Sequence, residues 1–430
     1  MITAAPPRPD SPMDHSAPVT ATASQDSTLA PLAEPLFRSL WIAAVISYTG
    51  SWMQNIATGW LMTSLTSSPM WVSMVQVALS LPVLLIALPA GALADLVDRR
   101  KFLLFTQSSM VAAALTLGIL TITSRCTPTL LLALTFLLGA GAVMNEPAWQ
   151  ALMPDLVSPP KLGSAIALNS AGFNMARAVG PALGGLVIAA AGSGTAFLLN
   201  AVSFFGVILF LYKWKPSFHP AGQVTTSISG ALLIGLRYTR QEHRITAVLV
   251  RLMIFSLFGS AFWALLPLVA SRFGATGYGA MLASFGIGAL VGALLLARAR
   301  RTLSFDAVAI SATVIFAVGL FGLVRSDSLL SSSIFAAAAG LAYLSILATL
   351  NLVIQFVCPG WVRARILSMY VLVLQGGFAL GSILWGALAS HTSVRFSMTT
   401  AAIALFCGLA LAPWYRLRQN SSIHGAHGVE

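Results

Sequence analysis

The sequence predicts an all-α integral membrane protein, with twelve transmembrane helices in two pseudo-symmetric six-helix halves. Hydrophobic residues make up 57% of its 430 residues and charged residues only 8%, whereas soluble domains carry about 25% charge. So little polar material could not cover the surface of a soluble protein. Runs of mostly uncharged residues recur along the chain, each of about the twenty residues that cross a hydrocarbon core. Short motifs also repeat between the two halves of the sequence.

The expected spans follow one another with short connections. Their runs are apolar on all sides rather than alternating, which favours helices over a β-barrel. The expected spans cover residues 38–63, 70–94, 102–124, 129–150, 164–191, 195–212, 246–270, 278–297, 306–325, 329–353, 366–389 and 395–414.

The net charge of +12 is explained by membrane topology rather than by nucleic-acid binding. With these spans, 18 of the 24 Lys and Arg residues fall on one side of the membrane and four on the other, and Arg177 and Arg251 lie inside spans. Basic residues concentrate on the cytoplasmic side of membrane proteins. We therefore expect a multi-pass protein of a bacterial inner membrane, surrounded by lipid, with both termini in the cytoplasm.

The remaining segments are tails and a linker. Residues 1–35 lack the charged and apolar regions of a signal peptide and are expected to form a disordered cytoplasmic tail. Six-helix bundles are expected over 36–212 and 246–415, joined by a cytoplasmic linker over 213–245, with a second tail over 416–430. Cys126, Cys358 and Cys407 fall in separate places and show no disulfide framework. No metal-binding spacing and no cofactor are indicated.

An internal repeat supports the two halves. The stretch "GALADLVDRR" begins at Gly91 and "GALLLARARR" at Gly292, an offset of 201 residues. "GPALG" at 180 and "GFALG" at 377 are 197 residues apart. Parallel halves of this kind are typical of transporters whose substrate site lies between them. Small residues also recur every fourth position, which lets helices pack closely in lipid, although glycine and alanine are common in membrane helices. They are Gly172, Ala176, Gly180 and Gly184 in one span and Ala280, Ser284, Gly288 and Gly292 in another.

"GALADLVDRRK" at 91–101 resembles the signature loop of the major facilitator superfamily, and "GPALGG" at 180–185 resembles the end of a motif found in its exporters. "NEPAWQALMPDLV" and "WVRARILSMYVLVLQGGFALGSILWGALA" are similar to the subgroup that contains the enterobactin exporter. The resemblance covers residues 36–415 and implies the major facilitator fold.

The resemblance also implies a conformational latch at the signature loop. The carboxylate of Asp95 would lie against the N-terminus of the span beginning near Arg365, where a helix dipole favours an anion. Arg99 would pair with Glu146, and the motif residues are Gly91, Gly180, Pro181 and Gly184. The alternative is that the basic residues only anchor the topology.

Polar residues inside spans are the candidates for binding a substrate. The resemblance implies that the first, fourth, seventh and tenth spans line the cavity. Arginines within a membrane are functional candidates in themselves, although both could instead form structural bonds, and Arg251 could reach the inner surface. The expected substrate contacts are Trp52, Gln54, Asn55, Arg177, Arg251, Trp263, Asn351 and Gln355.

One position departs from the drug/proton antiporters of the superfamily. They carry an arginine four residues before a glycine, where this chain has Thr135 before Gly139. Glu146 and Asp306 are the acids placed to carry a proton instead. No GxxxxGK[ST] loop is present, which argues against ATP as the driving force.

These observations predict a secondary exporter and not an enzyme. It would act as a monomer by alternating access, with the proton as coupling ion and no cofactor. The expected substrate is a polar or anionic small molecule such as a siderophore. A broad multidrug or antibiotic efflux pump is the alternative, and a non-transporting membrane sensor is a third.

Overall fold

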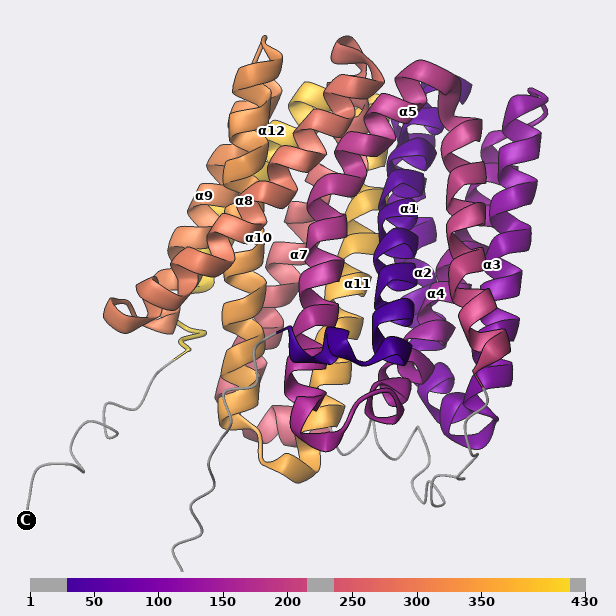
Figure 1. Ribbon diagram of the computed structural model, residues 1–430. Helices are drawn as coiled ribbons and strands as arrows, with labels where there is room; N and C mark the ends of the chain where they lie inside the picture. Colours follow the sequence, from indigo (N-terminus) through magenta and orange to yellow (C-terminus); the bar gives the residue numbers. More distant parts are fainter. Residues whose placement is uncertain (1–28, 215–235, 418–430) are drawn as a thin grey trace, which may run out of the picture.

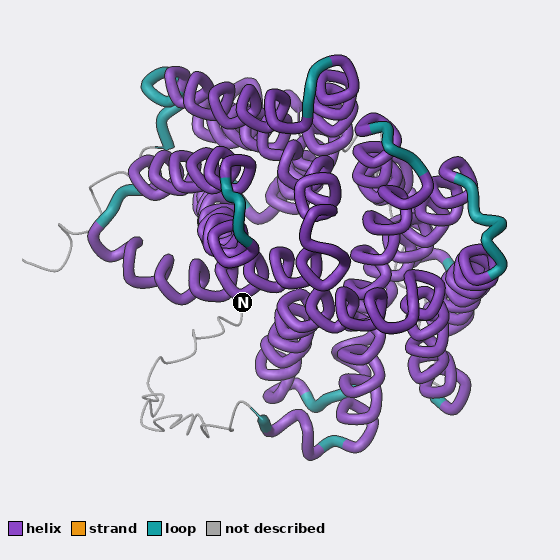
Figure 2. The backbone as a smooth tube through the Cα atoms, turned by 90° about the horizontal axis from the view of Figure 1, so that it is seen from above, coloured by secondary structure: helices purple, strands orange, loops and turns teal. Residues whose placement is uncertain are grey.

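Nearly all of the described chain is α-helix, and no strand occurs in it, which confirms the all-α prediction. The computed structural model describes residues 29–214 and 236–417, without the side chains at 88, 91, 92 and 94–96. Short loops join helices that run side by side (Figures 1 and 2). The helices are α1 (Pro35–Leu65), α2 (Pro69–Leu96), α3 (Arg99–Ile122), α4 (Pro128–Leu152), α5 (Leu162–Lys213), α7 (His243–Ala270), α8 (Gly274–Thr302), α9 (Phe305–Arg325), α10 (Leu329–Val357), α11 (Gly360–His391) and α12 (Val394–Gly408).

The longest helix, α5, contains two of the expected spans. Gly192 interrupts it with φ of 79°, a left-handed conformation that glycine adopts without steric cost. The two lengths of α5 meet at the top of Figure 1 and run down on either side of α1. The fifth and sixth expected spans, 164–191 and 195–212, correspond to these two lengths.

Prolines and capping side chains mark where several helices begin. Proline stands in the first turn of α1, α2 and α4, where its missing N–H is not needed. The side chain of Asp98 accepts a hydrogen bond from the Lys101 backbone N–H at 3.1 Å and caps α3. Ser304, Ser328 and Ser393 cap α9, α10 and α12 in the same way. Each cap satisfies an N–H that the helix itself leaves unpaired.

The surface is suited to lipid. Large apolar side chains are exposed on many helices, including Phe105, Leu294 and Phe356. In the described residues nine helical segments are long and apolar enough to cross a membrane, and two of them, 159–213 and 243–302, have the length of two crossings. The polar side chains of α1 lower its hydropathy, and it falls outside these nine. The count of twelve crossings therefore remains a prediction.

The helix contacts repeat from one half of the chain to the other. In the first half α2 packs on α4, α3 on α4 and α5, and α1 on α5. In the second half α8 packs on α10, α9 on α10 and α12, and α7 on α11. The glycines of the repeated motif make equivalent helix contacts in each half. Gly180 lies against Thr49 and Trp52 of α1, and Gly377 lies against Ser256 and Leu257 of α7. The fold therefore carries the internal repeat of the sequence.

The two halves meet through α2 with α11 and through α5 with α8. The backbone N–H of Met70, at the start of α2, donates to Ser390 Oγ near the end of α11 at 3.0 Å. Gly185 of α5 lies against Ala275 and Gly279 of α8. Both contacts lie at the helix ends opposite to the start of α1 and the end of α12, both of which lie in the lower half of Figure 1. The halves are thus closed against each other on the side opposite the described chain ends.

Candidate functional site

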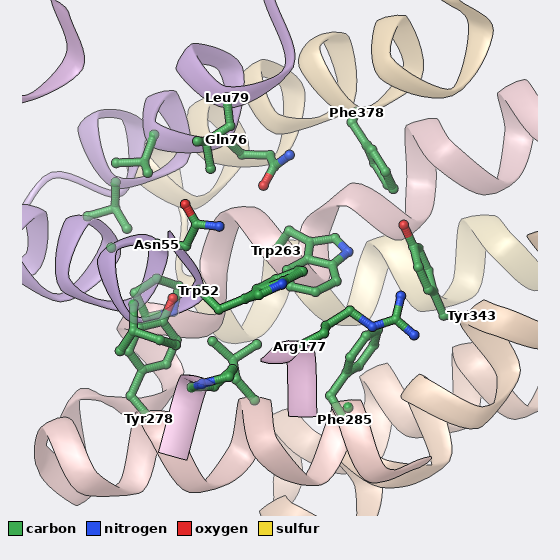
Figure 3. Close-up of a pocket in the computed structure, with 18 of the residues that line it drawn as sticks. Trp52, Asn55, Gln76, Leu79, Arg177, Trp263, Tyr278, Phe285, Tyr343 and Phe378 are labelled. Atoms are coloured by element: carbon green, nitrogen blue, oxygen red, sulfur yellow. The ribbon is translucent and has the colours of Figure 1, made fainter. Parts of the chain in front are cut away.

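A cavity of about 230 Å³ lies between the two halves. The first half contributes α1, α2 and α5, and the second contributes α7, α8, α10 and α11. Figure 3 shows side chains from these helices converging on it. Its polar and aromatic lining consists of Trp52, Asn55, Gln76, Arg177, Trp263, Tyr278, Phe285, Tyr343, Gln375 and Phe378.

Arg177 supplies the charge of this cavity. It projects from α5, and Figure 3 shows its guanidinium group pointing toward Tyr343 and Phe285. Its Nη2 is buried and has no hydrogen-bond partner within the described part of the chain. The lining contains no aspartate or glutamate. A buried donor without a partner is costly, so this nitrogen is free to donate to a group that enters the cavity.

The aromatic residues form a connected wall beside the arginine. The ring of Phe285 lies 4.8 Å from Trp263 and 5.5 Å from Tyr343, and the ring of Tyr343 lies 6.4 Å from Phe378. Edge-to-face and offset pairs at such distances are favourable. The wall offers flat apolar surface, and Asn55, Gln76 and Gln375 add groups that donate and accept hydrogen bonds.

Four of the expected substrate contacts reach the cavity together: Trp52, Asn55, Arg177 and Trp263. Four further residues line the cavity that were not predicted from the sequence: Gln76 on α2, Gln375 on α11, Tyr278 on α8 and Tyr343 on α10. Both glutamines interrupt strongly apolar stretches, "WVSMVQVALS" and "VLVLQGG", and that interruption is the signal that could have found them.

The other expected contacts lie elsewhere, and their hydrogen bonds explain why. Gln54 is buried inside the first half, where its Oε1 accepts from Asn200 Nδ2 at 2.5 Å. The amide of Gln355 donates to Asn351 at 2.6 Å on an exposed part of α10. Arg251 forms an ion pair with Asp306 at 2.5 Å and also donates to the Ala412 carbonyl. Arg251 is thus held by a structural ion pair with Asp306 in this conformation, and its role in substrate binding stays a prediction.

The charged signature loop holds the ends of first-half helices together. Arg99 Nη1 donates to the Ala151 carbonyl at the end of α4 at 3.4 Å. Arg100 donates to the carbonyls of Leu211 and Tyr212 at the end of α5, at 2.6 and 2.7 Å. The last carbonyls of a helix lack partners within it, and cations are favoured there.

The expected pairing of Arg99 with Glu146 is absent from this conformation. Glu146 instead accepts a hydrogen bond from Gln150 at 2.7 Å. Gly180 and Gly184 pack α5 onto α1 within the first half, while the Pro181 carbonyl lies at the contact with Gly279 of α8. Only the backbone is described at Gly91 and Asp95, so the role of Asp95 stays a prediction.

Comparisons with known proteins agree on the kind of molecule. A family profile of the major facilitator superfamily described as "Transmembrane secretion effector" matches residues 26–427. The staphyloferrin A transporter of Staphylococcus aureus is 21% identical over 85% of this chain and 92% of its own length. The multidrug efflux pump Tap of Mycolicibacterium fortuitum is 25% identical over 88% of this chain and 95% of its own.

Solved structures show the same fold at low identity. A bacterial homologue of the human lysosomal transporter Spinster, in an inward-facing and unoccupied conformation, has a TM-score of 0.69 and 12% identity, over 87% of this chain and 95% of that one. The nucleoside transporter NupG has a TM-score of 0.67 and 14% identity, over 87% of this chain and 98% of that one. The relatives and the structures named here are transporters and not enzymes.

Proposed function

The chain belongs to the transmembrane secretion effector family of the major facilitator superfamily, and on that premise we propose that it is a secondary active exporter of anionic or oxygen-rich small molecules. The observation that carries the proposal is the buried, unpartnered Nη2 of Arg177 in a cavity without an acid. A cationic cargo would meet uncompensated positive charge there. An anionic cargo would find the fork of donors that matches carboxylates and similar oxyanions.

Alternating access is the proposed cycle. The cavity lies between the halves, where the parallel repeats of such transporters place their substrates. The halves touch on the side away from the chain ends, through α2 with α11 and α5 with α8. If both termini are cytoplasmic, as the distribution of basic residues predicts, this conformation is closed toward the outside. Export would then require these contacts to part while the opposite ends close.

The proton gradient of a bacterial inner membrane is the proposed driving force, with the protein acting as a monomer. Of the two acids that the sequence left as proton carriers, Asp306 is held by Arg251 and by the Leu417 backbone N–H. Glu146 is exposed and has no ion pair within the described residues. Of the two acids, Glu146 is therefore the one without a counter-charge in the described residues.

The replacement Arg177→Lys tests the cargo assignment. It keeps the positive charge but replaces a planar fork with a point charge. We expect export of an anionic siderophore to fall by at least about tenfold, which corresponds to one charge-assisted hydrogen bond of roughly 1.4 kcal/mol or more. Efflux would be measured in cells that lack other exporters, with membrane levels of each variant checked by immunoblot.

Arg251→Lys is the matched control, because its partner is Asp306 and it lies outside the central cavity. We expect it to export at close to the wild-type rate. Equal export by wild type and Arg177→Lys would refute the role of the guanidinium fork.

Multidrug efflux is a second candidate function, favoured by the aromatic wall of the cavity. Flat apolar surface accepts many ring systems with little directional selectivity, and one relative is a multidrug efflux pump. The same cells separate the two functions when they are loaded with ethidium. Export of ethidium by the wild type without any effect on the siderophore would favour the multidrug function and exclude the first.

A further inference from the structure

A second and larger cavity lies within the first half. Its volume is about 680 Å³, and it lies between α1, α4, the η2 turn (Met153–Asp155) and the beginning of α5. These are the ends of the helices on the same side as the described chain ends (Figure 1). The residues that matter below are Tyr48, Glu146, Trp149, Asn169 and Phe173. None of them lines the central cavity.

Glu146 is the one charged residue among those that line this second cavity. It is exposed, and Gln150 donates to its Oε1 at 2.7 Å. No cation pairs with it in the part of the chain that the structure describes. The nearby arginine of the signature loop, Arg99, donates to the Ala151 carbonyl instead. The second cavity therefore carries a carboxylate that forms no ion pair with any side chain of the described residues.

Aromatic rings line the same cavity as Glu146. The ring of Tyr48 lies 6.4 Å from Trp149 and 5.4 Å from Phe173, at interplanar angles of 71° and 81°. Phe173 is 41% exposed. A cation over the face of an aromatic ring is attracted by the ring's quadrupole, and the attraction strengthens as water is excluded. A carboxylate beside several rings is chemically complementary to a lipophilic organic cation.

The row of rings continues toward the central cavity. The ring of Phe173 lies 6.2 Å from that of Trp52, and Trp52 lines the central cavity with Arg177. The two cavities are thus neighbours along α1 and α5 but have opposite charge. A lone exposed glutamate would be an ordinary solvated side chain. Glu146 differs because aromatic residues line the same cavity.

We propose that this second cavity is a binding site for lipophilic organic cations, with Glu146 as the counter-charge and Tyr48, Trp149 and Phe173 as the aromatic wall. The proposal uses neither Arg177 nor the central cavity. It therefore does not depend on the anionic cargo proposed above, and each can fail without the other.

Tetraphenylphosphonium and tetraphenylborate are suitable probes, because they have almost the same shape and opposite charge. Binding of each would be measured by equilibrium dialysis with the purified full-length protein in nanodiscs, against empty nanodiscs. We expect Glu146→Gln to weaken binding of the phosphonium about tenfold, which is the order of one lost charge interaction. Binding of the borate should stay the same or strengthen. Phe173→Ala should weaken phosphonium binding several-fold.

Asp155→Asn is the matched control, since Asp155 is an exposed acid at the same end of the molecule but does not line the second cavity. It removes the same charge and should leave phosphonium binding unchanged. Arg177→Gln should weaken the borate and spare the phosphonium. Thermal unfolding of each variant would show that it is folded.

Two results would overturn the proposal. One is unchanged phosphonium affinity in folded Glu146→Gln, which would mean that the carboxylate is not the counter-charge. The other is an equal loss in Asp155→Asn, which would mean that the general field of the surface attracts the cation. Loss of borate binding in Arg177→Gln would support the central anion site whatever happens at Glu146.

Discussion

Two arginines inside the membrane have different roles because of what lies beside each of them. Arg251 is 11% exposed in its side chain and faces Asp306, whose side chain is 24% exposed. The carboxylate also accepts the Leu417 backbone N–H at 2.9 Å, so the pair joins α7 and α9 to the chain after α12. Arg177 has no acid in its cavity. Arg251 Nε is also buried without a partner in the described residues, so the difference between the two arginines lies in their charge. The charge of Arg251 is neutralised by Asp306, whereas that of Arg177 has no counter-charge in the lining of its cavity.

At this scale we predict that Asp306→Asn destabilises the protein. The change leaves the Arg251 guanidinium largely buried without its counter-charge, and breaking a buried pair from one side is costly. Because Asp306 is partly exposed, we expect a loss of about 2 kcal/mol rather than the roughly 3–5 kcal/mol of a fully buried pair. Thermal unfolding in detergent would show a lowered Tm.

The exposed pair of Arg272 and Asp327 provides the control. Its atoms are 3.9 Å apart and the Asp327 side chain is fully exposed, so Asp327→Asn should leave the Tm unchanged, as for most exposed pairs. A Tm of Asp306→Asn equal to that of the wild type would contradict the structural role of the pair.

Glycines decide how closely whole helices approach each other. Gly172, Gly180 and Gly184 place α5 against α1, and Gly288 and Gly292 place α8 against the backbone of α10. These contacts lie within the halves. Gly185 and Gly279 differ because they face each other across the two halves, so they can control the conformation rather than the fold.

At the scale of elements we predict that Gly185→Leu opens the contact between α5 and α8. A Cβ at this position would lie 2.8 Å from the Ala275 carbonyl oxygen and 3.0 Å from the Gly279 Cα, and backbone atoms cannot move aside without moving the helix. The halves should therefore separate on the side away from the chain ends. The test adds Asn55→Cys, which places a thiol in the central cavity. An impermeant thiol reagent applied from that side should label this cysteine roughly tenfold faster if the free energy of the open conformation falls by about 1.4 kcal/mol.

Gly163→Leu is the control in the same helix, because a Cβ at Gly163 has no neighbour within 4 Å. Its labelling should match that of the wild type. Labelling of Gly185→Leu that did not differ from this control would show that the contact does not hold the halves together.

The molecule as a whole is organised by a repeated set of helix contacts. Within the halves, the contact of α2 with α4 corresponds to that of α8 with α10. Between the halves, the contact of α2 with α11 corresponds to that of α8 with α5. The second pair of contacts relates the halves to each other. An arrangement of this kind can close on one side of the central cavity and open on the other with little change inside each half.

At this scale the prediction concerns topology. Residue 275 lies near the start of α8, at the closed end of the cavity, and residue 225 lies outside the described residues. The distribution of basic residues predicts that a reporter at 275 is outside the cell and one at 225 is inside. An alkaline phosphatase and green fluorescent protein pair would check both sites. Reporters on the same side would contradict two halves of six crossings, because a single helix, α7, separates the two sites.

The sequence by itself determined the class of fold, most helix positions and the internal repeat. Apolar length, proline and serine at helix starts, and the spacing of glycines are local properties, and each corresponds to a helix or to a close packing contact in the structure. Three positions of the candidate site, Trp52, Asn55 and Trp263, followed from side chains with polar groups inside expected spans, and Arg177 followed from its charge within a span.

Only the tertiary structure decided which polar groups share a cavity. Gln54 and Asn55 are adjacent in the sequence, but one turns toward Asn200 inside the first half and the other toward the central cavity. Arg251 and Arg177 look alike in sequence because the partner of Arg251, Asp306, is 55 residues away along the chain. The burial, pairing and charge of a group depend on helices that are distant in the sequence, and no local pattern records how those helices pack.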